Sequence, residues 1–133
     1  MIKLEYFGEK KENQIGHIEV LVKVEHSNGS SINEELKHIV RHSPDGFQIG
    51  YGGSGCSDLA LSILTDFCER KDIDNSIVEE LYQKFKFNFI ANCGNKLNLK
   101  CKDIANWMIE KKPELRDKLF RSVDVKRNRE GIK

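Results

Sequence analysis

The spacing of apolar residues changes once along this chain, and this change constrains its fold more than any other feature. Up to Tyr51, apolar and polar residues alternate in short runs, most clearly over residues 16–25. Such alternation is typical of strands that bury one face. From Ser57 onward, apolar residues recur at steps of three and four, which is typical of amphipathic helices. The sequence therefore predicts strands first and helices afterwards.

The alternating half predicts four short strands separated by turn-rich segments. KKENQ, HSNGSS and SPDG contain the Gly, Asn, Asp, Ser and Pro residues that favour turns. Short connections of this kind favour antiparallel neighbours in a sheet. The predicted strands are residues 1–8, 16–25, 35–42 and 47–51.

The second half predicts about three helices that cover the sheet. They begin near Ser57, near Ile77 and near Lys102, and Pro113 ends or kinks the last one. A further short turn is expected through Leu115 and Phe120. We therefore expect one α+β domain over residues 1–122, with an N-terminal antiparallel sheet of about four strands packed against about three C-terminal helices. Residues 123–133 are expected to form a flexible basic tail.

The composition of the chain argues against several classes of protein. The 22 Lys and Arg nearly cancel the 21 Asp and Glu, so no net field attracts nucleic acid or an anionic membrane. No apolar run is long enough for a membrane span or a signal peptide, which predicts a cytoplasmic protein. The cysteines, Cys56, Cys68, Cys93 and Cys101, are irregularly spaced and are expected to be reduced thiols.

Residues 50–59, GYGGSGCSDL, match the dinucleotide-binding pattern G-x-G-x-x-G. In that fold the glycines follow a strand, open a helix and precede a second parallel strand that ends in an acidic residue. The first two conditions are met here. The third is not, because the segment before Asp72 and Asp74 does not resemble a buried strand. A Rossmann fold is therefore rejected.

A weaker hypothesis survives for the glycine stretch. Glycines between a strand and a helix let backbone N–H groups converge, and the helix N-terminus favours an anion. The alternative is that the glycines only allow tight packing, while Ser54 or Ser57 caps the helix and Asp58 interacts with its dipole. The candidate ligand-binding residues are Tyr51, Gly52, Gly53, Ser54, Gly55 and Ser57.

The remaining residue patterns do not predict a metal site or a catalytic site. His38 and His42 would lie about 13 Å apart on a strand, which is too far for one zinc ion. No catalytic constellation, metal site or cofactor is expected. Cys56 at the helix start has either a lowered thiol pKa or a simple packing role. Phe85 and Phe89 are expected in the core, which makes stacking of YQKFKFNF on nucleic acid the less favoured reading.

The segments SPDGFQIGYGGSGCSDLALSIL and ELYQKFKFNFIA resemble a family of small uncharacterised proteins carried by phages, plasmids and prokaryotic genomes. Its hallmark is similar to GF-x-x-GYGGSGP-x-x-LALAIL, and the likeness extends from about Tyr6 to Trp107. Cys56 replaces the usual proline, and Gln48 with Ile49 replaces an acidic residue and Trp. The resemblance implies no activity, so it assigns no catalytic residue.

The resemblance implies a context. Small phage-borne proteins without an enzyme motif are frequently accessory factors that inhibit host defences. The sequence therefore predicts a non-enzymatic accessory protein that binds a phosphate-bearing ligand, such as a signalling nucleotide, at the glycine turn. The alternative is a protein-binding inhibitor or regulatory module, for which the turn is purely structural. The expected partner is accordingly a nucleotide-like molecule or a protein target.

Overall fold

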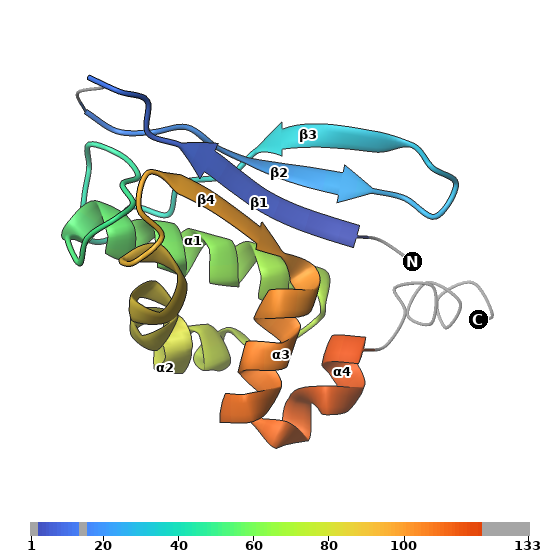
Figure 1. Ribbon diagram of the computed structural model, residues 1–133. Helices are drawn as coiled ribbons and strands as arrows, with labels where there is room; N and C mark the ends of the chain where they lie inside the picture. The colour runs from blue at the N-terminus through green and yellow to red at the C-terminus, as the bar shows by residue number, and fades with distance from the viewer. Residues whose placement is uncertain (1–2, 14–15, 121–133) are drawn as a thin grey trace.

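The computed structural model describes residues 3–13 and 16–120 and shows an α+β fold (Figure 1). Its sheet has four antiparallel strands in the order β3-β2-β1-β4. This confirms the predicted fold class, an antiparallel sheet packed against helices. The strands are β1 (Lys3–Glu9), β2 (Val20–Glu25), β3 (Ser31–Glu35) and β4 (Lys96–Lys100).

One face of the sheet is buried because alternate residues of its strands are apolar. Tyr6 of β1 lies opposite Val22 of β2 and Leu99 of β4, and all three side chains are buried. The intervening residues face away from the helices. β3 is exposed along its whole length, and Glu34 and Glu35 near its end discourage pairing with another chain at this edge.

Two of the four predicted strands are wrong. Residues 36–46 form a loop instead of a strand, because the third strand ends at Glu35. Residues 47–51 contribute only an isolated bridge between Ile18 and Phe47. The actual fourth strand, β4, follows the first two long helices in sequence and alternates buried and exposed residues over KLNLK. A segment of five residues gives too short an alternation to outweigh the helices on either side.

The helices agree better with the sequence. The three long ones are α1 (Ser54–Arg70), α2 (Asn75–Phe85) and α3 (Cys101–Lys111). Asp74 caps α2, since its carboxylate accepts the Ser76 N–H at 2.8 Å. The predicted helix through residue 90 continues as a π-helical turn, η1 (Lys86–Ile90). The expected C-terminal turn consists of η2 (Pro113–Leu115) and α4 (Arg116–Phe120).

Helix α1 is the centre of the molecule. It runs between the sheet and α2 in Figure 1, and every residue from Gly55 to Leu64 is buried. A helix that is buried on all sides has to satisfy its own polar side chains internally. Ser57, Asp58 and Ser62 are buried on α1, so the structure needs specific partners for each of them.

A polar network joins α1 to the sheet. The Tyr6 hydroxyl, on the buried face of β1, donates to the Asp66 carboxylate at 2.6 Å. Arg70 donates to the same carboxylate at 2.8 Å and to Glu34 of β3 at 2.9 Å. These bonds fix the C-terminal half of α1 against the sheet. The glycine turn lies at the other end of the helix, before its N-terminus.

The proposed boundary at residue 122 and the predicted basic tail, residues 123–133, lie outside the described residues. Among the helices that are described, none is long and apolar enough to cross a bilayer.

Candidate functional site

The glycine turn leads from the loop after Phe47 into the first turn of α1. Gly50 has a φ of +87°, and its N–H donates to the Ile90 carbonyl at 3.0 Å. The turn thereby packs on the end of η1. The predicted site residues divide by exposure: Tyr51, Gly52 and Ser54 are exposed, Gly53 is half-buried, and Gly55 and Ser57 are buried.

Close packing accounts for glycine at several positions of the turn. A Cβ at Gly55 would lie 2.9 Å from the Gln48 side chain, and one at Gly52 would lie 3.3 Å from the Phe87 ring. A Cβ at Gly53 would lie 2.2 Å from the Tyr51 ring. The glycines therefore have a structural role, and a ligand role has to be argued from the groups around them.

The start of α1 lacks the cap that the sequence predicts. Gly53 is the N-cap residue, and no described side chain caps the helix. Ser57 instead lies one turn inside, where its hydroxyl is 3.4 Å from the Gly53 carbonyl. The first turn of α1 contains no acidic residue, so no carboxylate there offsets the positive end of the helix dipole. The first N–H groups of α1, those of Ser54, Gly55 and Cys56, have no acceptor within the helix and no side-chain cap.

Lys86 places a cation beside this helix start. Its side chain is only 6% exposed, and its ammonium group donates to the Gly52 carbonyl at 3.2 Å and to the Ser57 hydroxyl at 3.0 Å. The Lys86 Nζ also lies 4.3 Å from the centre of the Phe87 ring. Among the described residues, no carboxylate forms an ion pair with it. The ammonium charge and the positive end of α1 therefore reinforce one another.

Two exposed aromatic rings flank the turn. Tyr51 is 51% exposed and Phe87 is 60% exposed, which is unusual for side chains of this size. Both lie against the turn, since the positions of Gly52 and Gly53 are confined by these two rings. The resulting surface combines free amides, a cation and two aromatic faces.

Sequence reasoning missed Lys86 and Phe87 because of the π-helical turn. Phe85 is buried and Phe89 packs against the core, as predicted. The wider turn of η1, however, rotates the residues between them. Lys86 is thereby turned inward under the glycine turn, and Phe87 is turned outward.

The Asp58 carboxylate is engaged by His38 and by the loop at residues 36–46. It is fully buried and lies 2.9 Å from the His38 Nε2. It also accepts the backbone N–H groups of His42 at 2.8 Å, Ser43 at 3.0 Å and Arg41 at 3.3 Å. These bonds hold the 36–46 loop against α1, where the sequence predicted a strand.

The two histidines have separate partners. His38 interacts with Asp58, while the His42 Nε2 lies 2.9 Å from the Tyr82 hydroxyl of α2. Next to them, Arg41 forms a two-bond ion pair with Glu79. Across the part of the chain that is described, no group of three or more His, Cys, Asp or Glu side chains is arranged to hold a metal ion.

The pKa of Asp58 gives a pH-dependent contribution to stability. Burial by itself would raise this pKa, but the hydrogen bonds from His38 and the loop amides outweigh burial and hold it below its ordinary value of 3.8. The depressed pKa stabilises the fold fully above the unfolded-state pKa, and this contribution is lost as the pH falls through the folded-state pKa.

We expect the free energy of unfolding to fall more steeply in the wild type than in Asp58→Asn between about pH 5 and about pH 2. Urea unfolding at a series of pH values measures both slopes. Asp74 and Glu79 also have lowered pKa values, so their contributions cancel in the comparison. Parallel slopes would contradict the assignment to Asp58.

Cys56 is a packed thiol. It is fully buried at the start of α1, and burial raises its pKa despite the nearby amides of Tyr51 and Gly53 and the charge of Lys86. The alternative of a lowered thiol pKa is therefore wrong, because the loss of hydration outweighs these amides and the Lys86 charge.

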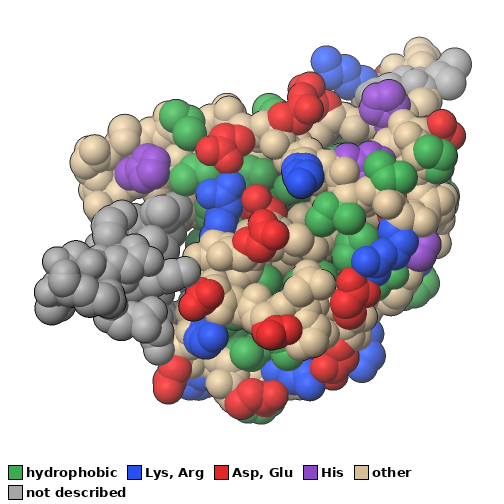
Figure 2. Space-filling model, turned by 180° about the vertical axis from the view of Figure 1, so that it is seen from behind, with side chains coloured by type: hydrophobic (Ala, Val, Ile, Leu, Met, Phe, Trp, Pro, Cys, Tyr) green, Lys and Arg blue, Asp and Glu red, His purple; other side chains and the backbone are tan. Residues whose placement is uncertain are grey.

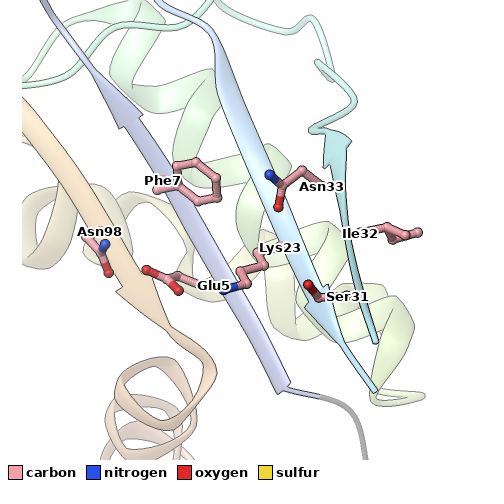
Figure 3. A pocket seen from close by; sticks show the side chains of 7 residues that line it. All are labelled: Glu5, Phe7, Lys23, Ser31, Ile32, Asn33 and Asn98. Carbon is pink, nitrogen blue, oxygen red and sulfur yellow. The ribbon is translucent and has the colours of Figure 1, made fainter. Parts of the chain in front are cut away.

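The face of the sheet that points away from the helices carries a shallow hollow of about 480 Å³ (Figure 3). Glu5, Lys23, Asn33 and Asn98 project from the four strands around Phe7, one from each strand. No buried cation or helix end lies in its lining. On the side of the molecule seen in Figure 2, basic and acidic side chains are interspersed, and no large patch carries charge of one sign only. The glycine turn with Lys86 is therefore the stronger candidate site.

A model described as "Family of unknown function (DUF6166)" matches residues 6–110 of the chain. The chain belongs to this family. The DUF6166 match covers β1 to α3 and includes the glycine turn, Lys86 and Phe87. No curated protein and no solved structure is significantly similar to the chain. Membership in DUF6166 carries no activity, so function has to be argued from the site.

Proposed function

We propose that this protein binds a phosphate-bearing small ligand, such as a signalling nucleotide, at the N-terminus of α1. The observation that carries this proposal is the buried Lys86 ammonium, which lies under the exposed glycine turn with only neutral partners among the described residues. A buried cation is costly without a counter-charge. An anion at the start of α1, beside the exposed Ser54, would supply that charge.

The flanking aromatic rings favour a ligand with a flat ring in addition to its phosphate. Exposed Tyr51 and Phe87 each offer a face on which a base can stack, a contact worth about 1–3 kcal/mol per base. Lys86 lies close to Phe87, so phosphate and base contacts would adjoin. The proposed role is that of a non-enzymatic accessory protein of a mobile element that sequesters such a ligand, for which the family resemblance gives the context.

Ser54 allows a test that separates binding from folding. It is exposed in the first turn of α1, where a carboxylate is favourable to the helix dipole but would repel a bound phosphate. Ser54→Glu and Ser54→Gln differ by one charge at nearly equal shape. We expect Ser54→Glu to melt no lower than Ser54→Gln and to lose the ligand.

The measurement is native mass spectrometry of each protein purified from its natural host, before and after denaturation. A dissociable mass with the ultraviolet absorbance of a nucleobase is expected for the wild type and for Ser54→Gln, and its absence for Ser54→Glu. A clean subunit mass for the wild type, or equal retention by both variants, would overturn the proposal. A substitution at Gly53 would not separate binding from folding, because any Cβ at this position displaces the Tyr51 ring.

The exposure of Tyr51 and Phe87 also favours a second function, a protein-binding inhibitor or regulatory module. Exposed aromatic side chains are frequent anchors in protein interfaces. A host protein that co-purifies with the wild type and with Ser54→Glu, but is lost from Phe87→Ala, would support this function in place of ligand binding. Phe87→Ala is suitable because the ring is mostly exposed, so its removal costs little stability.

A further inference from the structure

A second cavity of about 490 Å³ lies at the end of the sheet where β1 begins and β4 passes into α3. Its lining shares no residue with the glycine turn. A cavity of this size falls in the range of small-molecule sites. Residues of β1 and of α4, the first and the last described elements, contribute to its lining.

The rim of this cavity is basic. Five lysines and only two glutamates line it, and none of the seven forms an ion pair with another described residue. In the strand register, Glu25 lies opposite Lys3, and Glu5 lies opposite Lys23 and Lys100. The lining therefore has three more lysines than glutamates, and Lys71 and Lys102 are the two lysines that come from the helical layer.

The interior of the cavity is apolar. Leu4, Ala105 and Leu119 line it and are themselves almost fully buried, while the Phe120 ring lies at its edge and is 52% exposed. Apolar side chains below a cationic rim complement a molecule with one acidic group on an apolar body. A fully hydrated anion such as free phosphate would leave the apolar lining uncovered.

We infer that this cavity binds an amphiphilic anion, a single carboxylate or similar acidic head group on an acyl chain. The head group lies between Lys71 and Lys102, and the chain covers Leu4, Ala105, Leu119 and the Phe120 ring. This inference is independent of the proposed function, because the residues of the two sites are different.

The test uses decanoate as the probe and decanol as its uncharged counterpart, both below their aggregation limits, with the complete chain. Methyl resonances of Leu4, Ala105 and Leu119 report binding at the cavity. We expect saturable decanoate shifts at these methyls, with an affinity about tenfold lower in Lys71→Gln/Lys102→Gln. The matched control is Lys84→Gln/Lys96→Gln, which neutralises two exposed lysines outside the cavity and should bind as the wild type does.

Phe120→Ser tests the apolar contact to the acyl chain, since this exposed ring can be removed with little effect on folding. It is expected to weaken decanoate and decanol alike. The inference is overturned by the absence of saturable shifts at the three methyls, by equal affinity for decanol and decanoate, or by equal affinity in the two double-lysine variants. Binding of a short single-stranded oligonucleotide at the lysines, without decanoate binding, would also overturn it in favour of a polyanion site.

Discussion

Asp58→Ala is expected to lower the free energy of unfolding by about 3–5 kcal/mol, the largest effect among the predictions for single polar residues. The carboxylate is fully buried and is bonded by His38 and by the N–H groups of Arg41, His42 and Ser43. Alanine would leave these donors unpaired at the surface of α1. Each unsatisfied buried donor costs about 1–3 kcal/mol, with partial relief from water entering the loop.

Asp74→Ala is the matched control for Asp58→Ala. Asp74 also accepts a backbone N–H, but it is an exposed N-cap, and its loss is expected to cost about 1 kcal/mol. Urea unfolding compares the two variants, and limited proteolysis checks whether residues 36–46 open in Asp58→Ala. If Asp58→Ala were no more destabilising than Asp74→Ala, the carboxylate would not be the anchor of the loop.

Gly50→Ala is expected to be the most damaging of the single-methyl additions. Gly50 combines a φ of +87° with a backbone contact, because an added Cβ would lie 2.6 Å from the Gly94 carbonyl oxygen. The left-handed conformation alone costs a non-glycine residue about 1–2 kcal/mol. A clash with backbone cannot be relieved by side-chain rotation, so overpacking adds about 1–3 kcal/mol.

Gly29→Ala separates these two costs. Gly29 has a φ of +91° but nothing within 4 Å of an added Cβ, so it carries the conformational cost without the clash. Denaturant unfolding of both variants should give a lower free energy of unfolding for Gly50→Ala than for Gly29→Ala, by at least the overpacking cost. Equal destabilisation would show that the turn can move away from Gly94, and that it is less rigid than its packing implies.

The sequence was sufficient for the fold class and for most helices. The alternation over residues 16–25 correctly places Ile18, Val20, Val22 and Val24 in the core. The step of three and four after Ser57 correctly indicates α1. These patterns are reliable because burial of one face repeats over many residues and dominates the free energy of each element.

The strands after residue 30 could not be predicted in the same way. Residues 35–42 alternate, yet the Arg41 and His42 N–H groups bond the Asp58 carboxylate and the Ile39 N–H bonds the Ser62 hydroxyl, in place of a neighbouring strand. Their conformation therefore depends on a side chain far along the sequence. Strand β4 was not predicted as a strand at all, because its five residues are too few for a clear pattern and are a strand through pairing with β1. Local patterns do not encode such distant partners.

The sequence predicted where the glycine turn lies, while ligand binding at this turn stays a prediction. The glycine turn lies at the start of α1, as expected, and three of its six predicted residues are exposed. Lys86 and Phe87 were assigned to the less favoured reading, since a regular helix would not turn Lys86 inward. The insertion of a π-helical turn depends on the tertiary contacts of η1, which include the bond from the Gly50 N–H to Ile90.

The position of β4 in the sheet has a consequence for synthesis on the ribosome. The first 50 residues can form β1, β2 and β3 as they emerge, but β1 then still has a free edge, because its second partner begins only at Lys96. An unpaired central edge with alternating apolar residues can pair with other chains. Until β4 has been made, this edge of β1 therefore stays open to pairing with other chains, even when α1 already covers the face of the sheet.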